Sequence, residues 1–318
     1  MQKYFTSRRK IYNLKLNFIT GNKGFVGGNL EKYLKLQNKQ IKGVSRKPLG
    51  EEVGYKNLTV ERINNSRSFI HLAGKAHDLK NTSEDSIYFE VNTKLTKKLF
   101  DQFLESTCEV FIYMSSVKAA ADSVEGVLTE DVIPKPKTVY GKSKLAAEVY
   151  ILSKEIPINK RVYILRPCMI HGPNNKGNLN LLYNFVFKGI PYPFSKFENK
   201  RSFVSVDNLC FIINELLENK NIKSGIYNIA DDVSISTNQL VQIIGDTISK
   251  PVIFLSIPKF FIHILAKIGD LIPFPINSER VQKLTENYEV SNLKIKEAIQ
   301  KDLPLSTKEG IEKTIASF

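Results

Sequence analysis

The sequence contains no tryptophan and few of the residues that form disulfides or metal sites. Its three cysteines, Cys108, Cys168 and Cys210, include no C-x-x-C pair, which argues against a disulfide framework and against a cysteine zinc site. The four histidines also lack the spacing of metal ligands, and each is expected to be a packed or loop residue. We therefore expect no metal and a reducing, cytoplasmic location.

Acidic residues are scarce relative to basic ones, which gives the 318 residues a formal net charge of +14. The basic residues are 37 lysines and nine arginines, scattered along the chain. Because arginine leads in nucleic-acid recognition, this pattern predicts solvated surfaces and no nucleic-acid partner, and it is compatible with a small anionic substrate. The remaining composition, 42% hydrophobic and 25% charged, is that of an ordinary globular protein with one large domain or two smaller ones.

Long apolar runs are absent as well. The most apolar segment, residues 253–274, is interrupted by Pro258, Lys259, Lys267 and Asp270, so it is too broken to span a membrane. A helix packed on a folded domain is the favoured interpretation, and a helix lying in a membrane interface is the alternative. Residues 1–10 are basic and polar and do not resemble a secretory signal.

A glycine-rich turn near the N-terminus carries the clearest functional signal. Residues 20–27 read T-G-N-K-G-F-V-G, after an alternating apolar run at 14–19 and before a helical pattern that includes Leu30 and Leu34. Glycine lets the backbone approach a phosphate, and the following helix end offers unpaired N–H groups and a positive dipole. The implied ligand is a dinucleotide pyrophosphate, although a tight turn without a ligand has the same local pattern.

Further segments have strand and helix patterns in alternation. Residues 48–67 are the least readable, with 58–60 the one candidate strand there. Elsewhere we expect strands at 40–45, 110–114, 162–167 and 225–230, and a strand within 68–74 that runs into a loop. Helices are expected at 87–105, from 140 onward and at 236–248.

The end of the second strand bears on the choice of cofactor. In dinucleotide-binding folds an acidic residue at this place holds the free hydroxyls of NAD, whereas an arginine suits the phosphate of NADP. Residues 45–48 read S-R-K-P, without an acid, so Arg46 suggests NADP. A solvated loop arginine is the alternative.

Two serines and a Tyr-x-x-x-Lys pair are placed for chemistry. Ser115 and Ser116 end the predicted strand 110–114, and ligands in such sheets bind beyond the carboxyl ends of the strands. Tyr140 and Lys144, four residues apart, open the next helix and share one of its faces. The pattern also occurs at residues 150/154, further down the same helix, and at 192/196, where flanking prolines prevent a helix.

Together these segments resemble the extended short-chain dehydrogenases/reductases, and most closely the nucleotide-sugar epimerases and reductases of the NAD-dependent epimerase/dehydratase family. The glycine spacing with Phe25 resembles T-G-x-x-G-F-x-G, and residues 166–173 resemble R-P-x-x-V-Y-G-P with His171 in place of the tyrosine. The resemblance implies an α/β fold: a Rossmann-type, doubly wound parallel sheet over residues 11–171. A smaller C-terminal α/β substrate domain would cover 172–318, with some segments returning to the sheet.

The resemblance also implies roles for individual residues. Tyr140, Lys144 and Ser116 would be catalytic. The substrate would be contacted by Ser116, Asn178 and Arg201, with Arg280 a second candidate phosphate contact. The cofactor would contact Gly21, Gly24, Phe25, Val26, Gly27, Arg46, Leu72, Ala73, Gly74, Asn92, Tyr140, Lys144 and Pro167.

The expected chemistry requires an activated tyrosine. A free tyrosine with a pKa of about 10 is a poor base, and lowering the pKa to about 7 takes roughly 4 kcal/mol of preferential phenolate stabilisation. Lys144 can supply part of this, and the positive nicotinamide ring more. Ser116 would hydrogen-bond the reacting oxygen. The family's dehydratases carry Asp-Glu after the catalytic Ser/Thr, where this chain has Val117 and Lys118, so dehydration is disfavoured.

Two reactions stay open. Overall similarity favours a nucleotide-sugar 4-epimerase of the UDP-glucose/UDP-N-acetylhexosamine type, in surface-polysaccharide precursor synthesis, which keeps its NAD. Arg46 favours an NADPH-dependent 4-ketoreductase of a UDP-2-acetamido-2,6-dideoxy-4-hexulose. A non-catalytic dinucleotide-binding sensor or scaffold is the alternative of another class, but such proteins typically lose the tyrosine or the lysine. UDP and a lipid diphosphate both remain open as the sugar carrier, and a homodimer is compatible with the sequence.

Overall fold

The fold is built on a seven-stranded sheet in which all neighbouring strands run parallel. The computed structural model describes residues 15–75, 84–173, 175, 178–271 and 277–318. In sheet order the strands are β10 (Gly225–Ile229), β7 (Arg161–Pro167), β5 (Val110–Met114), β4 (Ser68–His71), β1 (Asn17–Thr20), β2 (Ile41–Ser45) and β3 (Val53–Gly54). The chain changes direction across the sheet between β1 and β4, where doubly wound sheets bind their ligands. The predicted Rossmann-type sheet is thereby confirmed.

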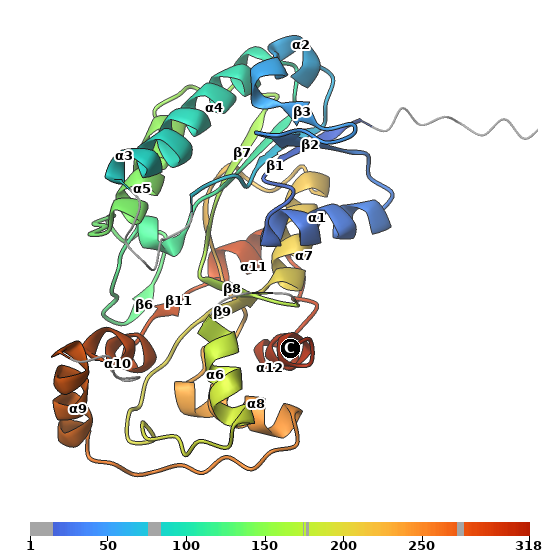
Figure 1. Ribbon diagram of the computed structural model, residues 1–318. Coiled ribbons are helices and arrows are strands. Elements are labelled where there is room, and N and C mark those ends of the chain that lie inside the picture. Colours follow the sequence, from blue (N-terminus) through green and yellow to red (C-terminus); the bar gives the residue numbers. More distant parts are fainter. Residues whose placement is uncertain (1–14, 76–83, 174, 176–177, 272–276) are drawn as a thin grey trace, which may run out of the picture.

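Helices cover both faces of this sheet (Figure 1). One face carries α2 (Val60–Ile63), α3 (Asp85–Tyr88), α4 (Leu95–Glu105) and α5 (Val139–Leu152), and the other carries α1 (Phe25–Leu36), α7 (Val206–Glu218) and α11 (Leu293–Ile299). Successive strand residues enter different cores: Phe18 packs with the first group and Ile19 with the second. Burial on both faces explains the nearly continuous apolar runs of these strands.

A smaller lobe lies beyond the carboxyl ends of the strands, in the lower half of Figure 1. It has its own apolar core, which includes Leu182, Leu240 and Ile262. Its elements are β8 (Met169–His171), α6 (Asn178–Phe187), β9 (Phe203–Ser205), α8 (Thr237–Thr247), α9 (Lys259–Leu271), α10 (Ser278–Thr285) and α12 (Thr307–Ile315). The boundary between residues 171 and 172 stays a prediction.

The short pair β6 (Val127–Leu128) and β11 (Glu289–Val290) joins the loop after β5 to the C-terminal part of the chain. The helix α8 begins as expected, because Ser236 and Gln239 form a capping box at its N-terminus. Within the residues that the structure describes, no helix is long and apolar enough to cross a membrane.

The helix predicted for residues 87–105 is interrupted by a π segment, Phe89–Lys94, between α3 and α4. Such a segment holds one residue more per turn than an α-helix, which changes the face that the following residues present. Within this segment Val91 is partly exposed, whereas its neighbour Asn92 is completely buried. Asn92, which the resemblance places at the cofactor, therefore belongs to the interior of the protein.

Residues 58–60 do not form a strand, contrary to expectation. Leu58 is buried in the sheet core, Thr59 is the N-cap of α2, and Val60 is its first residue. The strand in this region is the two-residue β3, which pairs with the end of β2. Two residues are too few to show an alternating pattern, which explains why the sequence did not reveal it.

Candidate active site

The glycine turn after β1 lies against the backbone that follows β4. Gly21 has a φ of +71°, and a Cβ on it would stand 2.9 Å from the Ala73 nitrogen. A Cβ on Gly27 would stand 2.1 Å from the Gly21 carbonyl oxygen, which in turn accepts a hydrogen bond from the Gly24 N–H at 2.9 Å. Larger residues would push these segments apart, so this close approach requires glycine. The turn leads directly into the N-terminus of α1, where backbone N–H groups and the helix dipole favour an anion.

The apolar residues expected around the cofactor line the same region. Phe25 and Val26, in the first turn of α1, and Leu72, after β4, are partly buried and pack on the sheet core. Phe25 reaches the chain just after β8, where a Cβ on Gly172 would stand 3.2 Å from its ring. Pro167 is buried at the carboxyl end of β7.

Ser116 and Tyr140 are joined by a side-chain hydrogen bond at the carboxyl end of β5. Tyr140 stands in the first turn of α5, whose N-cap Thr138 accepts a hydrogen bond from the Gly141 N–H at 3.2 Å. Ser116 follows β5, and its hydroxyl also accepts from the Lys118 N–H at 3.2 Å. The two hydroxyls that the sequence proposes for proton transfer are therefore adjacent.

Lys144 is buried one turn further along α5. Its Nζ donates to the Met114 carbonyl oxygen at 2.8 Å and lies 5.0 Å from the centre of the Tyr113 ring. Burial lowers the pKa of Lys144 to about 8, and the carboxylate of Glu148 opposes this shift. A side chain so placed still carries its charge at neutral pH.

The tyrosine itself is not activated in this state. Burial raises the pKa of Tyr140, the Ser116 hydrogen bond opposes that shift, and Tyr88 adds to it. Lys144 therefore does not lower the pKa of Tyr140, as had been expected, in this structure.

Gly74, Asn92 and Lys144 converge at one point. A Cβ on Gly74 would stand 2.9 Å from the Lys144 Nζ and 3.0 Å from the Asn92 Oδ1. Asn92 is held from both sides: its Oδ1 accepts from the Lys75 N–H at 2.8 Å, and its Nδ2 donates to the Ser143 hydroxyl at 3.0 Å. The loop after β4 is thereby fixed to the π segment and to α5.

The buried His71 connects β4 to Thr20 at the end of β1 and to Thr96 in α4. The sequence did not predict these contacts. His71 Nδ1 lies 2.7 Å from the Thr20 hydroxyl, and Nε2 lies 2.9 Å from the Thr96 hydroxyl. Since the Thr20 oxygen already accepts from the Ala73 N–H at 3.0 Å, its proton can be donated to Nδ1, which leaves Nε2–H as the donor to Thr96. Burial, and then the charge of Lys144, lower the pKa of His71 to about 3, so the ring is neutral. The expectation of a packed histidine is confirmed.

An acidic residue lies at the end of β2, where the sequence showed none. Glu52, seven residues after Ser45, accepts hydrogen bonds from the Ser45 hydroxyl at 3.1 Å and from the Asn22 side chain at 2.9 Å, and it pairs with Lys23 at 2.8 Å. Burial raises its pKa, but the hydrogen bonds from Lys23, Asn22, Leu49 and Ser45 together lower it to about 2. Arg46 is exposed in the same loop.

Only the fold could have revealed Glu52, because a loop brings it back to the strand end. The other histidines and acids give no hint of a metal centre: the described part of the chain holds no cluster of three potential metal ligands. The three cysteines are buried and free.

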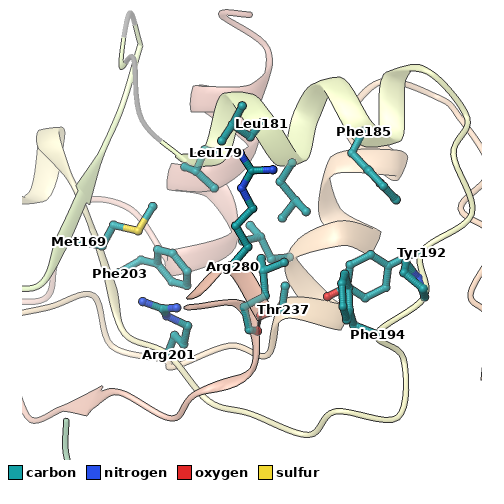
Figure 2. Close-up of a pocket in the computed structure, with 14 residues that line it drawn as sticks. Met169, Leu179, Leu181, Phe185, Tyr192, Phe194, Arg201, Phe203, Thr237 and Arg280 are labelled. Carbon is teal, nitrogen blue, oxygen red and sulfur yellow. Dashed lines mark hydrogen bonds between the residues drawn. The ribbon is translucent and has the colours of Figure 1, made fainter. Parts of the chain in front are cut away.

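A cavity of about 330 Å³ opens in the smaller lobe (Figure 2), and neither Tyr140 nor Lys144 is among the residues that line it. Its walls are mostly apolar, with the two predicted arginines among them. Figure 2 shows the Arg280 side chain running beside Leu179 and Leu181, and Arg201 next to Phe203. The cavity is lined by Met169, Leu179, Leu181, Leu182, Phe185, Tyr192, Pro193, Phe194, Arg201, Phe203, Thr237, Leu240, Arg280 and Leu284.

The predicted substrate contacts thus come from separate elements. Arg201 precedes β9 and pairs loosely with Glu286, 3.9 Å away, and Arg280 belongs to α10. Asn178 is the first residue of α6, and its side chain lies outside the described part of the structure.

Comparisons with known proteins agree with this geometry. The family model "NAD dependent epimerase/dehydratase family" matches residues 17–230. The chain is 31% identical over 319 residues to the UDP-glucose 4-epimerase of Vibrio cholerae, with 94% of each protein covered. It is 24% identical over 242 residues to an Escherichia coli N-acetyl-alpha-D-glucosaminyl-diphospho-ditrans,octacis-undecaprenol 4-epimerase, covering 73% of this chain and 72% of that protein. The fold of a Bacillus cereus UDP-N-acetylglucosamine 4-epimerase matches with a TM-score of 0.74 at 18% identity, over 95% of this chain and 98% of that one.

Proposed function

The chain belongs to the NAD-dependent epimerase/dehydratase family, and from this premise we propose that it is a nucleotide-sugar 4-epimerase of the UDP-glucose/UDP-N-acetylhexosamine type. The observation that carries the proposal is the Ser116–Tyr140 hydrogen bond, one helical turn from Lys144 at the carboxyl end of β5. The Vibrio cholerae relative, similar over nearly its whole length, supports the epimerase reaction.

The residues present fit a dinucleotide. Cβ atoms on Gly21 and Gly27 would fill the turn beside Ala73 and the start of α1, where a pyrophosphate would bind. Gly74, Asn92 and Lys144 would face the nicotinamide end, and Phe25, Val26, Leu72 and Pro167 would line the remainder. When bound, the cofactor would take a hydride from sugar carbon 4 and return it to the opposite face.

Glu52 favours NAD over NADP in this proposal. A carboxylate at the end of β2 can accept hydrogen bonds from ribose hydroxyls, and it repels a phosphate at the same place. Its pKa of about 2 keeps it ionised at neutral pH. Arg46 is the one feature that favours NADP and the 4-ketoreductase, which stays the second candidate.

The protein side chains would move one proton. Tyr140 would accept the hydroxyl proton of sugar carbon 4 as the hydride leaves and return it when the hydride comes back. Ser116 would donate its hydrogen bond to the reacting oxygen and share that proton. Lys144 would stabilise the phenolate by its charge, since its pKa of about 8 leaves it protonated at neutral pH.

The substrate would extend from Tyr140 toward the smaller lobe. Arg201 and Arg280 are suited to a diphosphate, because guanidinium groups pair with phosphate oxygens in a planar, bidentate manner. The apolar walls beside them suit the remainder of a carrier. We propose a UDP carrier. The Escherichia coli relative, whose name gives an undecaprenol diphosphate carrier, makes a lipid diphosphate the alternative. Asn178 and a homodimer stay predictions.

One experiment tests the proposal. Purified protein is incubated with UDP-glucose or UDP-N-acetylglucosamine without added cofactor, the products are followed by proton NMR, and the nucleotide released on denaturation is identified. Interconversion at carbon 4 with NAD released from the protein is expected. Turnover that requires added NADPH, with a 4-ketosugar substrate, would favour the reductase, and cofactor binding without any turnover would favour the sensor or scaffold.

A further inference from the structure

Helix α9 presents an apolar face to solvent. Three of its residues, Ile262, Ala266 and Gly269, are buried against the lobe. The outward side is nevertheless apolar, and its side chains are 37–87% exposed: Phe260, Phe261, Ile264, Leu265, Ile268 and Leu271. At 100° per residue these six residues cover one continuous side of the helix, opposite the buried one.

The polar residues of α9 form a narrow basic strip along one edge. Lys259, His263 and Lys267 fall on this edge together with Asp270, which is engaged at the helix end by the Ser278 N–H and hydroxyl at 2.9 and 2.6 Å. Apart from Asp270, residues 247–271 contain no acidic residue but include three lysines. An apolar face with a cationic edge is the pattern of helices that lie in the interface of an anionic membrane.

We propose that α9 docks the smaller lobe on an anionic phospholipid bilayer, with its six outward apolar side chains in the interfacial region and its lysines among the headgroups. The proposal does not depend on which reaction the enzyme catalyses. With 13 residues the helix is about 20 Å long, far too short to span a bilayer but sufficient to lie in its surface.

The size of the face argues against a second copy of the chain as its occupant. A helix side about 20 Å long and about 10 Å wide offers roughly 200 Å². A stable protein interface needs about 800 Å² from each partner. A bilayer has no such requirement, because apolar insertion and the attraction of lysines to anionic lipid add together.

The position of α9 links this surface to the cavity. The His263 ring contacts Phe197, with centroids 5.8 Å apart, and Phe197 in turn packs on Phe194, a cavity wall residue. Figure 1 shows α9 beside α10, at the end of the molecule away from the main sheet. A bilayer bound there would leave the glycine turn and the sheet free of the membrane.

The test is co-sedimentation of the full chain with vesicles of phosphatidylcholine, alone or mixed with phosphatidylglycerol. We expect binding to the anionic vesicles that weakens as salt is raised. Ile264→Ser/Ile268→Ser should reduce the partition coefficient by about tenfold or more, and Lys259→Gln/Lys267→Gln by about fivefold for each lysine. The matched control is Leu36→Ser/Ile158→Ser, which removes two exposed apolar side chains from the main-sheet domain and should change nothing.

Several results would overturn the proposal. The proposal is wrong if the wild type does not bind anionic vesicles. It is also wrong if the control variant loses as much vesicle binding as the α9 variants. A wild-type dimer that Ile264→Ser/Ile268→Ser converts to a monomer, without vesicle binding, would assign the face to a second copy. Turnover of soluble UDP-sugars is measured for all variants and should be unchanged, since none of these side chains lines the cavity. Failure of the wild type in that assay would contradict the proposed reaction and not the docking.

Discussion

Arg166 of β7 and Glu148 of α5 form a buried ion pair, with Nη2 and Oε2 2.5 Å apart and side chains no more than 1% exposed. Glu148 also accepts a hydrogen bond from Ser115, and it lies one turn beyond Lys144 on the same face of α5. The first of the two strand-end serines thus turns inward to this pair, while Ser116 turns to Tyr140. The pair fixes α5 to β7 beneath the residues proposed for catalysis.

Breaking this pair should be costly. Glu148→Gln leaves the Arg166 charge buried without its partner, for which about 3–5 kcal/mol of lost stability is typical. Urea unfolding at pH 7 measures this loss. The matched control is Glu148→Met/Arg166→Met, which removes both charges and should destabilise the fold less than the single change. A loss of less than about 1 kcal/mol in Glu148→Gln would show that the pair does not stabilise the fold.

Tyr140→Phe should leave the fold and cofactor binding intact but reduce turnover by at least about a hundredfold, because proton transfer by a positioned group contributes 10²–10⁴-fold. The initial rate of 4-epimerisation measures the effect. Tyr150→Phe, which removes a hydroxyl from the same helix outside the site, is the control. Near-normal turnover of Tyr140→Phe would exclude the tyrosine from the mechanism.

Glu52 and Arg46 should act in opposite directions on cofactor choice. Glu52→Gln removes the charge that repels a ribose phosphate, so NADP(H) affinity should rise relative to NAD(H). Arg46→Ala should weaken NADP(H) by about tenfold or more and leave NAD(H) nearly unchanged, if the guanidinium meets that phosphate. Calorimetric titration of both cofactors into each variant distinguishes these effects. Equal small losses for both cofactors in Arg46→Ala would leave Arg46 without a selective role.

The protein should lose stability in mild acid through His71. Its pKa is about 3 when folded, against 6.5 as the reference value, so the unfolded chain binds the extra proton between these values. His71 therefore makes its full contribution to the free energy of unfolding above pH 6.5. This contribution declines as the pH falls toward 3, by up to about 1.4 kcal/mol per pH unit. His71→Gln should make the urea-unfolding free energy less steep between pH 6.5 and 4.5. An unchanged slope in His71→Gln, compared with the same substitution at the exposed His263, would contradict this.

The sequence predicted best what depends on local pattern. Apolar runs located the central strands, the glycine turn placed β1 and α1, and the serine-ended strand with Tyr140 four residues before Lys144 gave the centre of the candidate site. Each of these signals lies within a few residues of the chain, where periodicity and turn chemistry are directly visible.

What the sequence could not show depends on contacts between distant or irregular segments. Glu52 reaches the end of β2 through a loop, so its spacing from Ser45 matches no strand or helix pattern. The burial of Asn92 arises from the π segment, whose period differs from the helical one that was assumed. The two ring nitrogens of His71 contact the hydroxyls of Thr20 and Thr96. These threonines come from other elements, so the sequence alone does not show that they lie next to the histidine.

Because of the π segment, the position of Asn92 depends on the number of residues between β4 and β5. Deleting a single residue within Phe89–Lys94 would let α3 and α4 join as one regular helix, and the residues of the present π segment would then point in other directions. Asn92 would then lose its hydrogen bonds with Lys75 and Ser143, although no side chain had been substituted. The surplus residue of the π segment therefore shapes the candidate site as much as a side chain does, and an alignment that treats it as a gap would overlook it.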